Sequence, residues 1–214
     1  MNSMILGIDE AGRGPVIGPL VIAGVLVDEE GLKRLVGLGV KDSKKLSPLQ
    51  RDELYQGIIG FAATHVVKIQ AKELDRLMVR KGLNEIEAKH FAEIIEKTAP
   101  IKAYVDAADV SPGNFELMIR GHLKALPALV VEHKADERYP VVSAASIVAK
   151  VERDREIRAL HKIYGDFGSG YPSDPKTNAF LNTCFQKNRS FPECVRKKWK
   201  TVARASNFKL EEFY

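Results

Sequence analysis

The chain has 214 residues, of which 45% are hydrophobic and 29% are charged, and its formal net charge is +5. This length and composition predict a soluble globule with a substantial core, most simply one large domain with or without a C-terminal extension. No apolar run reaches the roughly 20 residues of a membrane helix, and the N-terminus lacks the layout of a secretory signal, so we expect an intracellular, cytoplasmic protein.

The strands and helices predicted from the sequence alternate along the chain. Apolar runs predict strands at 4–9, 19–27, 64–70, 101–106 and 128–133. Helical periodicity predicts helices at 47–60, 72–77, 83–98, 111–126, 141–164 and 176–186. The first two strands flank a glycine-rich turn and can pair as a hairpin. This order indicates an α/β fold, with a mixed β-sheet flanked by helices and a helical C-terminal part.

The cysteines and the basic residues carry less information. Cys184 and Cys194 match no zinc motif, and we expect free thiols in a reducing compartment. Basic residues gather in three segments, at 41–45, 150–158 and 196–204. Each segment is either a solvated surface or part of a surface that follows a phosphate backbone, and the positive net charge favours polyanionic partners.

Acidic residues lie at the ends of three predicted strands. Asp9 and Glu10 end the first strand, Asp106 ends the fourth and Asp136 follows the fifth. Each one alone is explained as a turn residue or a helix cap, but strand ends line the functional crevice of α/β folds. Acids without neighbouring His or Cys suit Mg²⁺ or Mn²⁺ better than Zn²⁺. Two such ions, about 3.5 to 4 Å apart, can activate a water and stabilise the leaving oxygen of a phosphodiester.

A glycine-rich turn follows the first pair of acids, with Gly12, Arg13 and Gly14 in succession. Its spacing does not fit a dinucleotide fingerprint, and no Gly-Lys-Ser/Thr follows as in a Walker loop. Main-chain groups in such a turn can approach a sugar-phosphate closely, because no side chains intervene. A tight hairpin turn would explain the glycines, but it would not explain the adjacent acids.

Six segments resemble ribonuclease HII, the type 2 ribonuclease H, in its single-chain archaeal form. They are GIDEAGRGPVIGPLVIAG, KDSKKLS, AYVDAAD, EHKADERYPVVSAASIVAKVERD, GDFGSGYPSDP and VRKKWKT, in this order over almost the whole chain. The resemblance implies a ribonuclease H-like catalytic domain at 1–165, a C-terminal helical substrate-binding region at 166–206 and a tail at 207–214. It also implies endonucleolytic cleavage of RNA in RNA–DNA hybrids and of duplex DNA at single embedded ribonucleotides.

The same resemblance assigns roles to individual residues. Those that match the catalytic, metal-binding acids are Asp9, Glu10, Asp106 and Asp136, and they would hold two Mg²⁺ or Mn²⁺ ions. The expected reaction is in-line attack by an activated water 5′ of a ribonucleotide, leaving a 3′-hydroxyl and a 5′-phosphate. The backbone of Gly12, Arg13 and Gly14 would sense the ribose 2′-OH, and Tyr171 would pack on the sugar beside the cut.

Further positions match the family less specifically. Those that resemble the phosphate path are Lys134, Ser143, Ser146 and Lys150. Lys44 and Lys45 are candidates for holding the DNA strand. Small helix-packing residues remain the alternative for the two serines, and surface charge remains the alternative for Lys44 and Lys45.

The chain ends in NFKLEEFY, which resembles the sliding-clamp binding motif of replication and repair enzymes. The matching residues are Asn207, Leu210, Phe213 and Tyr214. The motif normally begins with glutamine, and Asn207 is one methylene shorter. An apolar tail that folds back on its own domain is the alternative, but a terminal aromatic pair favours insertion into a partner pocket. The family resemblance implies a monomer.

Other classes of protein compete with this interpretation. A non-catalytic nucleic-acid or clamp-binding adaptor would account for the basic segments and the tail but not for the four acids. An integrase or resolvase would account for the acids but lacks the Gly-Arg-Gly turn and the Ser-Gly-Tyr loop. Ribonuclease HIII is a closer relative, but it carries an extra N-terminal domain, whereas here the first strand begins within ten residues of the start.

Overall fold

The computed structural model describes residues 3–40 and 46–202. Their contacts divide the chain into two compact units. The first unit contains the residues up to Ala11, Val21–Val67 and Lys81–Glu152, and the second contains Gly12–Leu20, Lys68–Arg80 and the residues from Arg153 onward. In this division the glycine turn and residues 68–80 group with the C-terminal part, and the last boundary falls between Glu152 and Arg153.

The first unit is built around a five-stranded mixed sheet, whose strands lie in the order β3-β2-β1-β4-β5. The strands are β1 (Ile5–Ala11), β2 (Leu20–Val27), β3 (Ala63–Ile69), β4 (Lys102–Asp106) and β5 (Ala128–Glu132). β1 pairs antiparallel with β2, which confirms the predicted hairpin. β1 and β4 are parallel, as are β4 and β5, so these three strands end at the same edge of the sheet.

Eight helices begin and end within the described ranges, and residues 200–202 are also helical. The eight are α1 (Glu29–Gly37), α2 (Pro48–Ile59), α3 (Ala71–Leu77), α4 (Leu83–Thr98), α5 (Pro112–Arg120), α6 (Ala135–Arg138), α7 (Pro140–Tyr164) and α8 (Pro175–Asn188). Neither α1 nor α6 was predicted from the sequence. The predicted end of α5, Leu126, lies six residues too late, because Gly121 caps that helix. Among these residues no helix is both long enough and apolar enough to cross a membrane.

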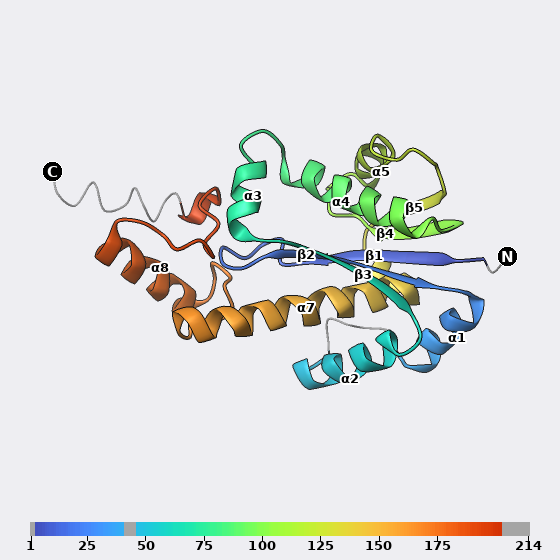
Figure 1. Cartoon of the computed structure of the whole chain (residues 1–214), viewed down its shortest axis with the longest axis horizontal. Coiled ribbons are helices and arrows are strands. Elements are labelled where there is room, and N and C mark those ends of the chain that lie inside the picture. The colour runs from blue at the N-terminus through green and yellow to red at the C-terminus, as the bar shows by residue number, and fades with distance from the viewer. Residues whose placement is uncertain (1–2, 41–45, 203–214) are drawn as a thin grey trace. The chain divides into compact units, whose positions relative to one another are not determined.

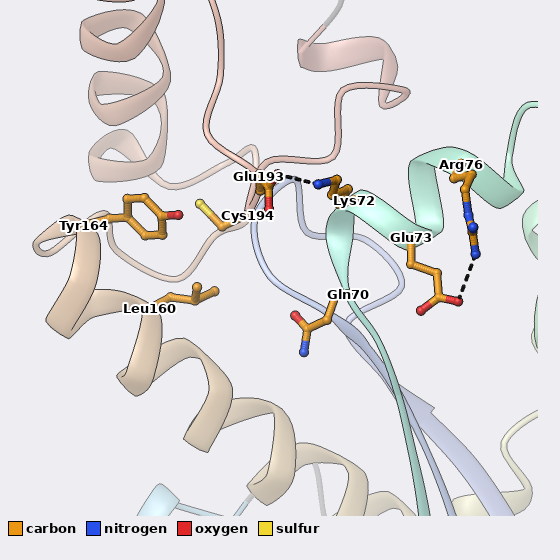
Figure 2. A pocket seen from close by; sticks show the side chains of 8 residues that line it. All are labelled: Gln70, Lys72, Glu73, Arg76, Leu160, Tyr164, Glu193 and Cys194. Atoms are coloured by element: carbon orange, nitrogen blue, oxygen red, sulfur yellow. Dashed lines mark hydrogen bonds and ion pairs between the residues drawn. The ribbon is translucent and has the colours of Figure 1, made fainter.

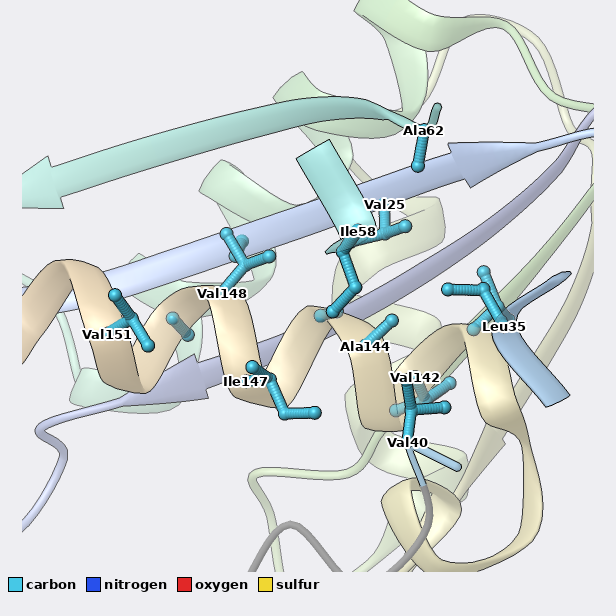
Figure 3. Packing of buried hydrophobic residues seen from close by; sticks show 14 of the residues in the cluster. Val25, Leu35, Val40, Ile58, Ala62, Val142, Ala144, Ile147, Val148 and Val151 are labelled. Atoms are coloured by element: carbon cyan, nitrogen blue, oxygen red, sulfur yellow. The ribbon is translucent and has the colours of Figure 1, made fainter. Parts of the chain in front are cut away.

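Helices cover both faces of the sheet in the first unit. Figure 1 shows α4 and α5 on one face, and α1, α2 and the first half of α7 on the other. On the α7 face, Leu35 and Ile58 pack with Val25 and Val148 in one buried cluster (Figure 3). A Cβ added to Gly7 of β1 would lie 2.3 Å from the Val141 carbonyl, so glycine allows α7 to approach this strand closely.

The second unit has a smaller core of its own. Val16 and Ile17, from the glycine-rich segment, pack there with Phe167, Leu181 and Val195. Cys194 lies in this cluster, and both cysteines are free thiols, as predicted. The segment that follows β1 is therefore built into the core formed by the C-terminal part of the chain.

Candidate active site

Three carboxylates converge at the edge where the parallel strands end. One oxygen from each of Asp9, Asp106 and Asp136 lies within 4.8 Å of the other two. Asp9 comes from β1, Asp106 is the last residue of β4, and Asp136 lies in α6, just after β5. The structure thus brings together three of the four acids that the sequence analysis singled out.

Hydrogen bonds fix two of these carboxylates. Asp106 Oδ1 accepts from the Ala135 backbone N–H at 2.9 Å, which ties the end of β4 to the start of α6. Asp9 Oδ1 accepts from the Glu10 backbone N–H at 2.7 Å, and Asp9 also shares a hydrogen bond with the Ser146 hydroxyl of α7. Two of the acids are therefore held by main-chain or buried groups before any ligand binds.

The electrostatics of the cluster are unfavourable without a cation. Asp9 and Asp136 are each only 5% exposed. Burial raises the pKa of Asp9 well above its ordinary value, and the neighbouring charges of Glu10 and Asp106 raise it further. A bound divalent cation would reverse this penalty, and an all-oxygen donor set of this kind suits a hard ion. The residues present therefore fit a divalent metal site.

Glu10 is not a member of this group of three. Successive side chains of a strand point to opposite faces, and Glu10 follows Asp9 directly within regular β1–β2 pairing. Asp9 pairs with Ala23, which lies in the cluster on the α7 face, whereas Glu10 pairs with Ile22. The charge of Glu10 nevertheless acts on Asp9, as its effect on the pKa shows.

The glycine turn belongs to the second unit, and its two outer glycines differ in kind. Gly12 is buried with φ +89°, and an added Cβ would lie 2.6 Å from the Pro19 carbonyl oxygen, so folding itself requires glycine. Gly14 is exposed and lies outside the left-handed region, and an added Cβ would make an ordinary 3.5 Å contact with Tyr171 Cε1. The fold does not require glycine at position 14.

Tyr171 lies next to this turn in the same unit and is 40% exposed. The Gly170 carbonyl beside it accepts hydrogen bonds from the Val16 and Ile17 backbone N–H groups at 2.8 and 3.2 Å. Asp174 supports the Tyr171 loop by accepting from both the backbone N–H and the hydroxyl of Ser169. These bonds lower the pKa of Asp174, so it stays ionised. An exposed glycine and an exposed aromatic ring thus lie side by side, and the loop that holds the ring is fixed by these hydrogen bonds.

Comparison with known proteins identifies the class to which these features belong. A family model described as Ribonuclease HII matches residues 6–202. The chain belongs to the ribonuclease HII family. It is therefore a ribonuclease H, a hydrolase that cuts as an endonuclease, and this family depends on divalent metal ions.

Individual relatives agree over nearly the full length. A ribonuclease HII of Archaeoglobus fulgidus is 50% identical over 212 residues, covering 98% of this chain and all of the relative. The crystal structure of ribonuclease H2 from Pyrococcus horikoshii OT3 superposes with a TM-score of 0.89 at 45% identity, over 96% of this chain and 98% of that one. The structure of a PCNA:RNase HII complex from Archaeoglobus fulgidus matches with a TM-score of 0.86 at 49% identity, over 92% and 95% of the two chains.

The other residues matched to ribonuclease HII lie in varied surroundings. Lys134 is exposed in a left-handed backbone conformation, and Lys150 is half-buried. Ser143 is fully buried and its hydroxyl donates to the Val40 carbonyl, which favours the packing alternative for this serine. Ser146 is also buried and bonded to Asp9. The remaining matched positions lie outside the described residues: Lys44, Lys45, Asn207, Leu210, Phe213 and Tyr214.

Two arginines that the sequence analysis counted only among the basic segments are buried. Arg153 is 7% exposed and Arg196 is fully buried. Arg196 Nε donates to the Gly18 carbonyl at 2.8 Å, and its Nη1 donates to the Arg13 carbonyl at 3.4 Å, so it braces the glycine turn from within. The sequence could have predicted the burial of Arg153, because it lies four residues before buried Ile157 and four after buried Ala149, on one face of α7.

The second unit also contains a cavity of about 660 Å³ between α3, the second half of α7 and residues 193–194 (Figure 2). Its charged groups pair with one another: Lys72 binds Glu193 at 2.6 Å, and Arg76 lies 3.7 Å from Glu73. Burial raises the pKa of the Cys194 thiol to about 12, so it stays protonated near neutral pH. None of the residues that line this cavity belongs to the acid cluster, the glycine turn or the Tyr171 loop.

Proposed function

We propose that this ribonuclease HII cleaves the RNA strand of RNA–DNA hybrids and cuts duplex DNA on the 5′ side of embedded ribonucleotides, in ribonucleotide excision repair. The products would be a 3′-hydroxyl and a 5′-phosphate. The observation that carries the proposal is the convergence of Asp9, Asp106 and Asp136, two of them buried, at one edge of the sheet. Like charges held this closely are explained by a catalytic cation site.

The residues that would hold Mg²⁺ or Mn²⁺ are Asp9, Asp106 and Asp136, with Glu10 as the fourth acid. A pair of bound ions would polarise the attacking water and stabilise the leaving oxygen. Asp9 would keep its position through the Glu10 backbone N–H and the Ser146 hydroxyl, and Asp106 through the Ala135 N–H. No nucleophilic side chain is needed in such a reaction.

The glycine turn and Tyr171 would provide the selectivity for ribose. Gly14 supports this role, because it is exposed, lies beside the ring and is glycine at a position where folding tolerates a side chain. A missing side chain there leaves room for the main chain of Gly12, Arg13 and Gly14 to reach a sugar 2′-OH. Tyr171 offers a flat apolar face and a hydroxyl that can donate to the same group.

Basic residues would hold the phosphate backbone of the duplex. Exposed Lys134 and half-buried Lys150 are the described candidates, with Lys44 and Lys45 as further ones. Ser146 would act through Asp9, and Ser143 through packing. We propose that the enzyme is a monomer and works in the cytoplasm of a prokaryotic cell, where chromosomal DNA lies.

We also propose that the tail binds a sliding clamp through Asn207, Leu210, Phe213 and Tyr214. The Archaeoglobus relative, 49% identical, has been solved as a PCNA:RNase HII complex. Deleting residues 207–214 should abolish binding to an immobilised clamp while cleavage of short duplexes continues. Clamp binding that survives the deletion would place the contact elsewhere.

The decisive experiment is cleavage of a labelled DNA duplex that contains one ribonucleotide, with Mg²⁺, with Mn²⁺ and with chelator. Wild type should cut 5′ of the ribonucleotide only with metal, Asp106→Asn should be inactive, and Tyr171→Ala should be impaired. Glu53→Gln, which removes an exposed carboxylate of α2, serves as the matched control and should cut normally. Binding without cutting under every metal condition would favour the adaptor alternative, and cutting of all-DNA duplexes would favour the integrase or resolvase class.

A further inference from the structure

Arg153 is a buried cation in the second unit, and its burial needs an explanation. The side chain is only 7% exposed, and burial lowers the pKa of its guanidinium. Its nearest carboxylate oxygen among the described residues, Asp154 Oδ1, lies 4.0 Å from Nη1, at the limit of an ion pair. A charge this poorly paired is normally expelled from a protein interior unless another contact holds it.

The contacts that hold Arg153 involve the residues proposed to sense ribose. The guanidinium carbon lies 5.2 Å from the centre of the Tyr171 ring, within the range of a cation–π interaction. Nη2 donates to the Ser169 carbonyl at 3.1 Å, two residues before Tyr171. Cδ and Nε lie 2.8 and 2.9 Å from the point where a Cβ of Gly12 would be, so the same side chain packs against the glycine turn.

We infer that Arg153 is a positioning residue that fixes the Tyr171 ring against the glycine turn, so that ring and turn meet the ribose as one rigid surface. This inference rests on the proposed function of Gly12 to Gly14 and Tyr171. Arg196 supports the turn through the Gly18 and Arg13 carbonyls, and its guanidinium lies over the Trp199 ring. Arg153 contacts both parts, the Tyr171 loop and the glycine turn.

Two substitutions separate the properties of the guanidinium. Arg153→Lys keeps the positive charge but loses the planar fork that lies over the ring. Arg153→Gln keeps a planar amide but loses the charge, and its side chain is too short for an N–H group to reach the Ser169 carbonyl as Nη2 does. If positioning of the Tyr171 ring requires both the positive charge and the planar guanidinium of Arg153, each variant should lower kcat/KM on a single-ribonucleotide duplex about tenfold. Combined with Tyr171→Ala, neither should lower it further, because the ring that Arg153 orients is gone.

Arg158→Lys is the matched control, because Arg158 is an exposed arginine of the same helix. In the double variant, the fold-changes in kcat/KM caused by Arg158→Lys and by Tyr171→Ala should multiply, because the two residues act independently. A second readout is the ratio of dissociation constants for a single-ribonucleotide duplex and the matched all-DNA duplex, measured with Ca²⁺ in an Asp106→Asn background. Arg153→Lys should reduce this ratio, whereas a purely structural role would weaken both duplexes equally.

The outcomes distinguish failure of this inference from failure of the proposed function. A wild type that never cuts, or a Tyr171→Ala variant with unchanged ribose selectivity, overturns the proposed function and this inference with it. A selective wild type and an impaired Tyr171→Ala, together with Arg153 variants whose effects multiply with that of Tyr171→Ala, overturn the inference alone. Loss of a cooperative thermal transition in both Arg153 variants also overturns it, because Arg153 would then be a core residue.

Discussion

Asp9→Asn should make the metal-free protein more stable while it destroys activity. Asp9 is buried beside two other acids, and its pKa in the folded state is raised above that of the unfolded chain. A group of this kind stabilises the fold fully only below its unfolded pKa, and that stability is lost as the pH rises through the folded pKa. Asparagine has no charge to lose, and its oxygen still accepts from the Glu10 N–H.

The magnitude follows from distance and from linkage. Two unit charges 4.8 Å apart repel by about 3.5 kcal/mol at an effective dielectric constant of about 20. Linkage sets a ceiling of about 1.4 kcal/mol for each pH unit above the unfolded pKa of about 3.9, or roughly 4 kcal/mol at about pH 7. We therefore expect Asp9→Asn to gain about 2 to 3 kcal/mol near neutral pH, which is roughly 5 to 10 °C in Tm for a domain of this size.

Thermal unfolding followed by circular dichroism in chelator, from about pH 4 to about pH 8, measures this effect. The difference between Asp9→Asn and wild type should be close to zero at the acid end and should grow with pH. Adding Mg²⁺ or Mn²⁺ should then raise the Tm of wild type but not that of Asp9→Asn. Glu53→Gln should show neither effect. A variant that is less stable than wild type at neutral pH, or a difference that does not change with pH, would refute the reasoning.

Three further predictions concern the second unit and the metal cluster. Gly14→Ala should fold with a nearly unchanged Tm, but its rate of cleavage at single ribonucleotides should fall about tenfold or more. Gly12→Ala should lose about 1 to 3 kcal/mol of stability, because Gly12 has a positive φ and an added Cβ would clash with Pro19. Equal melting temperatures for the two variants would contradict this contrast. Cys194, with a pKa of about 12, should resist alkylation in the native protein at about pH 8 and react only on unfolding, as mass spectrometry of quenched samples would show. Asp106→Asn should keep the hydrogen bond from the Ala135 N–H, so its loss of activity should come with an unchanged circular dichroism spectrum.

The sequence predicted most of the fold because strands and long amphipathic helices have strong local patterns. The five strands and the 141–164 helix lie close to their predicted positions. The α1 helix was missed because glycines interrupt its pattern, although Asp28 caps it by accepting from the Gly31 N–H at 2.8 Å. The α6 helix was missed because four residues are too few to show a period.

The candidate site was predictable in its members but not in its geometry. Asp9, Asp106 and Asp136 were recognisable as acids at strand ends, and parallel pairing brings them together. Glu10 lies outside the three acids whose oxygens come within 4.8 Å of one another, although its charge acts on Asp9; strand alternation, which adjacency in the sequence conceals, accounts for this. The buried arginines could not be told from surface ones by charge alone, because their roles depend on carbonyls and rings that lie far away in the sequence.

The bonds around the glycine turn have a consequence for synthesis of the protein. The Val16 carbonyl accepts from the Arg196 N–H, the Gly18 N–H donates to the Cys194 carbonyl, and the Arg196 side chain reaches back over 178 residues to Gly18. A nascent chain on the ribosome therefore completes its acidic strands long before it can complete this turn. The part proposed to recognise ribose closes only after Arg196 has been synthesised, so a shorter nascent chain carries the acids without this closed turn.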